Sequence, residues 1–412
     1  MTDPGNPPAV AAPMRNLESS GLAPGIVVFD LSVASNSPAG SCVLAEVNGL
    51  QGHYPVTVFS DRFDGGNADS KVWVRVPLPQ RPIFIRYWLF QVLAPLRYLV
   101  WRLSNAKPAI IQTTQGQFLW ADLAYAHFCH RAYLKGQWKQ STVTGLRRVL
   151  RRINHGYNAF MERLAFRRVR KIVVPSLGLQ RELTREYPEV AGKIVVISNP
   201  VDLEHYARPV DFDRAHKRAE LGCDDSHVVF VFVALGDFAR KGLGLILPAL
   251  AGLPAEQLDR ARLLVVGGGA GEIEQYRRQA ESLGILDKLR FVGLQKDVRS
   301  YLWAADVLAF PSAYEIFSLA ILQAAAAGLP PIVSQGLYGA EEFVEHQVNG
   351  WVVTRDEEGV RTALSDAISH AERLPDMSKA AQTSVQQYSQ SAFVVKWNDL
   401  YAEMMCSEGY AR

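Results

Sequence analysis

Short aliphatic runs alternate with helix-length segments along most of this 412-residue chain, and no other feature limits its fold as strongly. Runs of Val and Ile without polar alternation are typical of strands covered on both faces, as in parallel sheets flanked by helices. The first set of runs covers 26–31, 56–59, 109–113, 122–126, 171–175 and 194–197, with a loop over 32–40 and a helix over about 41–52. The second set covers 227–234, 263–266, 290–292, 307–310 and 331–333.

Two sets of similar size predict an α/β protein with two doubly wound, Rossmann-like domains of parallel sheet. The pattern breaks at 199–209, where two prolines and Asp202 interrupt it. Parallel sheets bind ligands beyond the carboxyl ends of their strands, so we expect the functional site in a cleft between the domains. The predicted organisation is a disordered tail over 1–22, a first domain over 23–200, a second domain over 201–388 and a final helix within 389–412.

The composition excludes several classes of protein. With 48% hydrophobic and 21% charged residues, the chain has too much apolar material for a disordered or coiled-coil protein. Its four cysteines are scattered and form no CxxC pair, which disfavours a zinc ribbon and favours reduced thiols in the cytoplasm. The N-terminal residues lack the pattern of a secretory signal, and the longest charge-free apolar run, 87–96, is far shorter than the ~20 residues of a membrane span. We therefore expect a cytoplasmic protein.

A basic loop follows the first strand of the second set. The segment Gly236-Asp237-Phe238-Ala239-Arg240-Lys241-Gly242 stands between that strand and a helix expected from about Leu243. A turn at the carboxyl end of a strand and the amino end of a helix suits an anion. Arg240 offers a planar fork of donors and Lys241 a point charge, and both suit phosphate oxygens. Taken alone, a solvated basic loop explains the segment equally well.

A second segment, 310–323, joins a strand to an apolar helix expected from about Ile316. The first-turn amides of that helix, on Phe317, Ser318 and Leu319, would lack partners within the helix. Glu315 stands beside this terminus, where the helix dipole favours an acid. By itself an acid in this place is more often a helix cap than a ligand.

These two segments and the Ala-Gly-Leu-Pro sequence at 327–330 occur in an order and spacing that resemble the C-terminal half of a GT-B glycosyltransferase of family 4. More distant matches are Val-Pro-Ser at 174–176, Ile-Ser-Asn-Pro-Val-Asp at 197–202 and Ala-Ala-Asp at 304–306. The basic loop particularly resembles that of the lipopolysaccharide-core glucosyltransferases in this family. The resemblance covers about 171–351 well and the earlier residues faintly.

The resemblance implies an activity and a set of residues. The activity is retaining, metal-independent transfer of a hexose from a nucleotide sugar such as a UDP-sugar to a glycan or lipid-linked acceptor, as in polysaccharide biosynthesis, without a cofactor. Arg240 and Lys241 would bind the donor diphosphate and stabilise the leaving group as charge develops on it. Glu315 would bind hydroxyls of the sugar. Further donor contacts are implied at Gly236, Leu294, Val298, Phe317, Ser318 and Leu319, with the nucleobase near 294–298.

Two positions depart from the family pattern. Gln323 stands where a second Glu usually holds the ribose hydroxyls, and it keeps an acceptor oxygen but lacks the charge. Ser318 stands where a Gly is usual. These departures leave a second hypothesis open, that of a catalytically weak or inactive GT-B-like binding or partner protein.

The first domain carries fewer signals. Gly40 is the best match to the family's Gly-rich loop near the donor phosphate, and His127 or His130 matches its active-site histidine, with His127 preferred because it directly follows a strand. A polar residue at a domain surface explains either histidine as well. No pair of carboxylates in this half suggests a covalent nucleophile, so we favour same-face attack at an oxocarbenium-like centre.

The small net charge of +3 hides an asymmetry along the chain. Between Ser70 and Met161 fourteen basic residues face one acid, Asp122, and aromatic residues are interleaved with them over 84–101. Such a span suits an anionic membrane surface, a plain core with a solvated basic face, or single-stranded nucleic acid. The resemblance favours the membrane, because the family's first domain binds the acceptor, and we expect no nucleic acid. It also implies that the final helix crosses back to the first domain.

Overall fold

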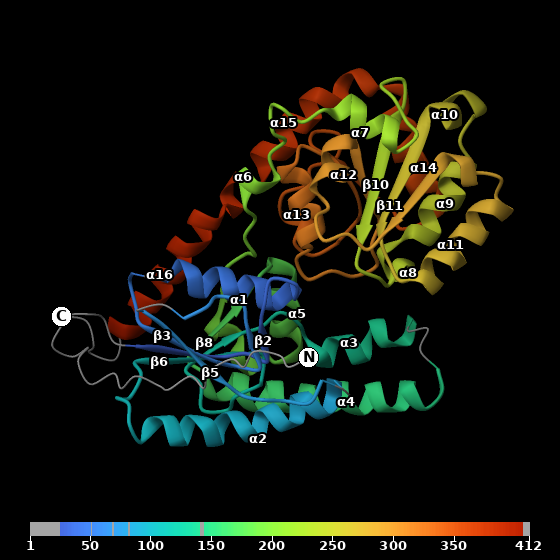
Figure 1. Cartoon of the computed structure of the whole chain (residues 1–412). Helices are drawn as coiled ribbons and strands as arrows, with labels where there is room; N and C mark the ends of the chain where they lie inside the picture. The colour runs from blue at the N-terminus through green and yellow to red at the C-terminus, as the bar shows by residue number, and fades with distance from the viewer. Residues whose placement is uncertain (1–24, 51, 68–69, 81–82, 141–143, 407–412) are drawn as a thin grey trace, which may run out of the picture.

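The computed structural model describes residues 25–50, 52–67, 70–80, 83–140 and 144–406, and the tail expected over 1–22 lies outside them. Two α/β domains lie beside each other, each built on one parallel sheet (Figure 1). The fold class predicted from the alternating pattern is therefore confirmed. No helix in the described part of the chain combines the length and hydropathy needed to cross a bilayer.

The first domain contains a seven-stranded sheet in the order β5-β3-β1-β6-β7-β8-β9, in which every pair is parallel. Its strands are β1 (Ile26–Phe29), β3 (Val56–Ser60), β5 (Lys71–Arg75), β6 (Ile110–Thr114), β7 (Leu123–Tyr125), β8 (Lys171–Val174) and β9 (Ile194–Val196). A short parallel pair, β2 (Ser32–Val33) and β4 (Arg62–Phe63), lies beyond it. The helices of this domain are α1 (Pro38–Gly49), α2 (Ile83–Arg102), α3 (His130–Lys135), α4 (Gly145–Arg168) and α5 (Leu177–Glu186).

The second domain contains a six-stranded parallel sheet in the order β12-β11-β10-β13-β14-β15. Its strands are β10 (Val228–Ala234), β11 (Ala261–Gly267), β12 (Leu289–Gly293), β13 (Val307–Phe310), β14 (Pro331–Ser334) and β15 (Trp351–Val353). Its shorter helices are α6 (Leu203–Tyr206), α7 (Arg214–Glu220), α8 (Phe238–Lys241), α10 (Ala255–Arg260), α12 (Arg299–Ala304) and α13 (Leu319–Ala326). The longer ones are α9 (Leu243–Ala251), α11 (Ala270–Ser282), α14 (Glu357–Ser369) and α15 (Leu374–Ser384), and the chain ends with α16 (Gln390–Cys406).

The central strands are buried on both faces, as their composition predicts. All four residues of β1 and six of the seven in β10 are buried. In the first domain Phe29 stacks between Phe59 and Phe118, with ring centroids 4.8 and 3.8 Å apart. Because neighbouring strands of each large sheet are parallel, their carboxyl ends lie at one edge of the sheet, and that edge carries the candidate site.

The chain crosses between the domains twice, at neighbouring places. After β9 it enters the second domain, and Val201 forms a β-bridge with Ser389 just before α16. Helix α16 then packs on the first domain, where Trp397 and Tyr401 are fully buried beside α1 and β6 (Figure 1). Tyr401 also contacts the buried carboxyl group of Glu46, with 2.6 Å between the oxygens.

Three local features differ from the sequence-based expectation. Helix α1 begins at Pro38 and ends at Gly49, earlier than expected, because Ser37 caps it by accepting a hydrogen bond from the amide of Gly40 and proline is preorganised for the first helical position. The same capping shortens the loop expected over 32–40. Strand β5 was not expected, because it is only half-buried. Strand β15 was not expected either, although it is as long as β7 and β9, which the sequence predicted.

Candidate active site

The basic loop closes into a single helical turn, α8, directly after β10. Asp237 before this turn and Gly242 after it have left-handed backbone angles, with φ of 61° and 96°. A Cβ atom on Gly242 would lie 2.4 Å from the carbonyl oxygen of Pro311. Glycine therefore lets the basic loop sit directly against the segment that follows β13.

That contact brings the predicted cations and the predicted acid together. Glu315 Oε1 accepts hydrogen bonds from Lys241 Nζ, from Arg240 Nη1 at 3.1 Å and from Ser312 Oγ at 2.9 Å. Arg240 also donates from Nε to Asp237 Oδ2 at 2.6 Å. Two motifs that are some 75 residues apart in sequence thus form one charged cluster at the strand ends.

The cluster is mostly shielded from water, so its charges act on one another strongly. The side chains of Lys241 and Glu315 are 16% and 11% exposed. Burial lowers the pKa of Lys241, while the Glu315 carboxylate opposes that shift. Burial also acts to lower the pKa of Arg240, but Glu315 and Asp237 outweigh it and raise that pKa. A ligand with two or more negative charges could replace Glu315 as the partner of both cations.

Helix α13 begins at Leu319, three residues later than the expected start at Ile316. Its amides without a partner in the helix are those of the N-cap residue Ser318 and of 319–321, so of the three amides expected to face a ligand only that of Phe317 lies outside this set. Phe317 lies before the helix in an irregular segment, and Ser318 is its N-cap residue, without a side-chain cap bond. The expected helix start was therefore wrong.

The reason for the late start is the burial of Phe317. Its ring packs against Phe343 and Tyr388, with centroid distances of 6.4 and 5.4 Å. Its carbonyl oxygen accepts a hydrogen bond from Asn199 Nδ2 at 3.4 Å, and Asn199 Oδ1 accepts one from the hydroxyl of Tyr125 at 3.2 Å. The segment before α13 is thus tied to the crossing between the domains and to the end of β7.

The other residues predicted to contact the donor do not belong to the charged cluster. Gln323 lies on α13, half-buried, and its side chain forms no hydrogen bond to a described residue. Leu294 is exposed after β12, and Val298 is the N-cap residue of α12. Gly236 precedes α8, with Glu272 as the nearest side chain. Their contacts with a donor remain predictions.

On the first domain, His127 follows β7 and has a free ring nitrogen. Its Nε2 atom is buried and lacks a hydrogen-bond partner among the described residues. Burial lowers its pKa to about 3, so the ring is neutral near pH 7. By contrast, His130 Nδ1 lies 2.8 Å from His155 Nδ1, and His130 Nε2 lies 3.7 Å from Glu162. The geometry favours His127 as the histidine with hydrogen-bonding capacity left for a ligand.

Gly40, the other first-domain candidate, has a packing role. It lies in the first turn of α1, and a Cβ atom there would fall 2.2 Å from the carbonyl oxygen of Ser32. The contact between α1 and β2 therefore requires a residue without a side chain at this position. The predicted approach of Gly40 to a phosphate remains a prediction.

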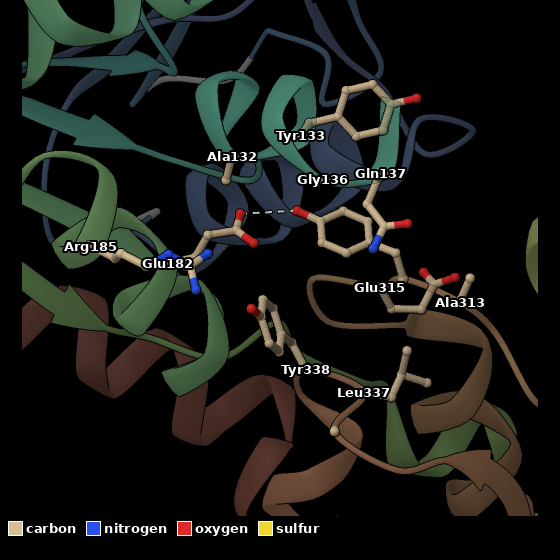
Figure 2. Close-up of a pocket in the computed structure, with 12 residues that line it drawn as sticks. Ala132, Tyr133, Gly136, Gln137, Glu182, Arg185, Ala313, Glu315, Leu337 and Tyr338 are labelled. Atoms are coloured by element: carbon tan, nitrogen blue, oxygen red, sulfur yellow. Dashed lines mark hydrogen bonds between the residues drawn. The ribbon is translucent and has the colours of Figure 1, made fainter. Parts of the chain in front are cut away.

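A cavity of about 220 Å³ adjoins Glu315 between the two domains. Figure 2 shows the residues that line it. Glu182 on α5 accepts a hydrogen bond from the hydroxyl of Tyr314 at 3.1 Å across it, and burial raises the pKa of that carboxyl group. The cavity is lined by Ala132, Tyr133, Gly136, Gln137, Glu182, Arg185, Ala313, Tyr314, Glu315, Gly336, Leu337 and Tyr338. Except for the part of this lining within 310–323, sequence reasoning missed these residues, because they belong to no motif and only the fold brings them together.

Two family models match consecutive parts of the chain. The model described as Glycosyltransferase Family 4 matches residues 39–205, which include most of the first sheet. The model described as Glycosyl transferases group 1 matches residues 213–384, which include the second sheet and the charged cluster. Together they cover both domains.

Curated relatives match over part of their length. A D-inositol 3-phosphate glycosyltransferase from Saccharomonospora viridis is 33% identical over 236 residues, which are 55% of this chain and 54% of that protein. The lipopolysaccharide core biosynthesis glycosyltransferase LpsE from Rhizobium meliloti is 30% identical over 181 residues, which are 43% of this chain and 50% of that protein. The chain thus spans about half the length of the curated relatives it matches.

Solved structures match over nearly the whole chain. WaaG, a glycosyltransferase involved in lipopolysaccharide biosynthesis, has a TM-score of 0.74 at 17% identity, over 91% of this chain and 99% of that one. HepE from Anabaena in complex with UDP-glucose has a TM-score of 0.69 at 16% identity, over 92% of this chain and 100% of that one. At these identities the likeness shows a shared fold.

Proposed function

Because this chain belongs to the group 1 glycosyltransferases of family 4, with the GT-B fold, we propose that it moves a sugar from a nucleoside-diphosphate sugar to a glycan or lipid-linked acceptor. One observation carries this proposal: Arg240, Lys241 and Glu315 meet in one shielded cluster where the strands of the second sheet end. Such a cluster offers two cations to a diphosphate and one carboxylate to sugar hydroxyls.

The chemistry that follows is stabilisation of a leaving group. When the bond between the anomeric carbon and the diphosphate breaks, negative charge grows on the departing phosphate oxygen. Arg240 can meet that charge with a fork of donors and Lys241 with a point charge, both already held in place by Glu315. Preorganised charges of this kind need no rearrangement at the moment of reaction, which is why they accelerate it.

We assign the acceptor to the cavity beside Glu315, which residues of both domains line. Tyr133, Tyr314 and Tyr338 supply flat apolar faces, and Glu182 and Gln137 supply hydrogen-bonding groups, which together suit a sugar ring with its hydroxyls (Figure 2). His127, with a neutral ring and an unpartnered Nε2, would hydrogen-bond to the reacting sugar near the anomeric carbon.

We further propose a retaining, metal-independent transfer of a hexose. The acceptor hydroxyl would attack on the face that the diphosphate leaves, and a phosphate oxygen would take its proton. The cations Arg240 and Lys241 supply the positive charge that a divalent ion supplies in other transferases, which supports the absence of a metal requirement. A UDP-sugar is the first donor to test, since the structural neighbour HepE was solved with UDP-glucose.

We place the reaction at the cytoplasmic face of an anionic membrane, where the basic first domain would meet a lipid-linked acceptor. Exposed apolar and basic side chains on α2 and α4 support this proposal. The matching lipopolysaccharide glycosyltransferases WaaG and LpsE support an acceptor in cell-surface glycan synthesis.

A thermal-shift screen of nucleotide sugars in EDTA tests the proposal. A ligand that binds only the folded protein raises its melting temperature, so the true donor and its nucleoside diphosphate should both stabilise the chain without metal. Transfer should then follow with the stabilising donor. If no UDP-, GDP- or ADP-sugar stabilises the protein, the proposal is wrong.

Gln323 favours one rival, a GT-B-like binding protein without turnover, because it lacks the charge of the usual Glu. The same screen separates the two. Stabilisation by a nucleotide sugar without transfer to any acceptor, and without its hydrolysis, would support the rival.

A further inference from the structure

Helix α2 exposes an apolar stripe on the side that faces away from the core. Its members recur every three or four residues, which places them on one face of the helix. Leu103, directly after the last turn, is 86% exposed, and Val100 is 67% exposed. The stripe consists of Trp88, Val92, Leu96, Leu99, Val100 and Leu103.

The opposite face of α2 packs in the core of the first domain. Phe90, Ala94 and Tyr98 are buried there, and Tyr98 contacts Phe29 and Phe59. The helix is therefore apolar on both faces, which is why its sequence shows no clean helical period. One face serves the fold, and the other is largely exposed.

Helix α4 exposes a second apolar stripe with the same spacing. Leu146 in its first turn is 72% exposed. The stripe consists of Leu146, Val149, Leu150, Ile153 and Phe160. No acid lies in the exposed part of this 24-residue helix, since its one carboxylate, Glu162, is 1% exposed on the buried side.

The two stripes join into one surface, here called the α2–α4 band. The rings of Trp88 on α2 and Tyr157 on α4 are 5.4 Å apart, and Tyr157 donates a hydrogen bond to Gln91 of α2. Figure 1 shows the two helices side by side along the lower edge of the first domain, on the side away from the second domain. Of the nineteen large hydrophobic side chains exposed in the described part of the chain, eleven belong to this band.

Arginines flank the band on both sides. Arg97 on α2 and Arg147, Arg151 and Arg152 on α4 are exposed next to the stripes. Neither helix presents an exposed acid. Apolar side chains bordered by cations match the boundary of a bilayer, where acyl chains lie below anionic headgroups.

We propose that the α2–α4 band docks on an anionic lipid surface, with the leucine and valine side chains inserted at the acyl boundary and the arginines at the headgroups. This inference rests on the proposed function and extends it, because it names the surface that would bring the cleft to a lipid-linked acceptor. A large exposed apolar patch on a monomer marks a partner, and the arginines select a negatively charged one.

Charge favours a membrane over a second copy of the chain. A two-fold dimer through this band would set arginines of one copy near arginines of the other, with no acid on either helix to pair with them. An anionic bilayer satisfies the same arginines and covers the same leucines.

Vesicle flotation tests the inference without any assay of transfer. The wild-type chain should float with vesicles that contain phosphatidylglycerol and bind at least about tenfold more weakly to pure phosphatidylcholine. The double variant Leu96→Glu/Leu150→Glu should lose about tenfold or more in binding, since it removes two inserted side chains and adds like charge. The pair Arg151→Gln/Arg152→Gln should weaken binding to the anionic vesicles alone.

Val210→Glu in the second domain is the matched control, because Val210 is fully exposed and distant from the band in sequence and domain. It should float like the wild type, and all variants should keep the wild-type melting temperature, which shows that they fold. Equal flotation of the leucine variant and the wild type would overturn the inference. A dimer in solution that the leucine variant dissociates, with no vesicle binding, would overturn it too. A flotation result stands whether or not a nucleotide sugar binds, so it is separable from the proposed function.

Discussion

The two domains share a parallel-sheet architecture but treat their charged residues in opposite ways. In the second domain Arg240 and Lys241 are drawn inward and held by Glu315. In the first domain Arg97 of α2 and Arg147, Arg151 and Arg152 of α4 are exposed beside the apolar stripes. The same layered fold can therefore arrange cations as a compact pocket, which suits a small anion, or as a broad surface, which suits an extended anionic surface.

The cleft repeats this contrast at the level of single residues. On the second-domain side Arg240, Lys241 and Glu315 are paired with one another. This part of the site is therefore already assembled in the free protein. On the first-domain side His127 has a buried ring nitrogen without a partner among the described residues. The second domain therefore supplies fixed charge, while the first supplies hydrogen-bonding capacity.

Replacing the fixed charge should have the largest effect on catalysis. Lys241→Ala removes one of the two cations that would face the leaving group, and we expect kcat to fall about a hundredfold or more. Steady-state kinetics with the donor found in the screen measure this. Lys379→Ala, an exposed lysine on α15, is the control and should leave kcat unchanged. An unaltered kcat in Lys241→Ala would contradict the claim that the second domain supplies fixed charge to the leaving group.

Removing the hydrogen-bonding capacity should have a smaller effect. His127→Ala should lower kcat about tenfold, the value of one lost hydrogen bond. Because burial holds the pKa of His127 at about 3, its ionisation should not appear in the pH–rate profile near neutrality. A wild-type ionisation near pH 6.5 that disappears in His127→Ala would show that the ring titrates and that its assigned neutral role is wrong.

Two glutamates that are largely shielded from water sharpen the comparison through their different partners. Glu315 faces two cations, whereas Glu46 in the first domain faces the neutral side chains of Tyr401 and Gln112. The hydroxyl oxygen of Tyr401 lies 2.6 Å from Glu46 Oε1 and 2.5 Å from Gln112 Oε1. Gln112 Nε2 donates a hydrogen bond to Glu46 Oε2 at 2.9 Å. Burial raises the pKa of Glu46 from 4.5 to about 8. A protonated Glu46 completes a closed ring of three hydrogen bonds, since the single hydroxyl proton of Tyr401 can serve only one acceptor.

The sign of the resulting pH dependence follows from the raised pKa. Between 4.5 and about 8 the folded state holds a proton on Glu46 that the unfolded state has lost, so stability from this group is full at low pH and is lost as pH rises through 8. Glu46→Gln preserves the ring and cannot titrate. We expect it to be about 1 kcal/mol more stable than the wild type at pH 8, with a flatter pH profile in urea unfolding. Equal slopes for both proteins would contradict the protonated ring.

The smallest effect concerns the departure at Gln323. Gln323→Glu introduces the carboxylate that the family pattern usually has at this position. Charged acceptors form stronger hydrogen bonds than neutral ones. We expect nucleoside diphosphates to bind about threefold tighter, with no such gain for their 2′-deoxy analogues. Calorimetry measures both, and an equal gain for the deoxy compounds would exclude a ribose contact.

Contiguous motifs explain why much of the second domain could be predicted from the sequence. The Val and Phe run of β10 and the nearby Arg240 and Lys241 stand within fourteen residues, 228–241, so local pattern and chemistry point to the same place. The grouping of these cations with Glu315 followed from the order of the strands, because parallel strands end at one edge.

Long-range packing explains what could not be predicted. The late start of α13 results from burial of Phe317 against Tyr388, 71 residues later, which no local signal contains. The bond between Tyr314 and Glu182 joins residues 132 positions apart on different domains. In α2 the periodicity was obscured because both faces are apolar, so the sequence could not separate the core face from the exposed one.

The central claim is that Arg240 and Lys241 bind the donor through its diphosphate, and a calorimetric comparison of nucleoside diphosphates with monophosphates tests it most directly. The wild type should prefer UDP, GDP or ADP over the matching monophosphate by about tenfold or more. Lys241→Gln should lose this preference, while Glu315→Gln, which keeps both cations, should retain it. A wild-type protein that binds the two forms equally, or a Lys241→Gln variant that keeps the full preference, would contradict the account.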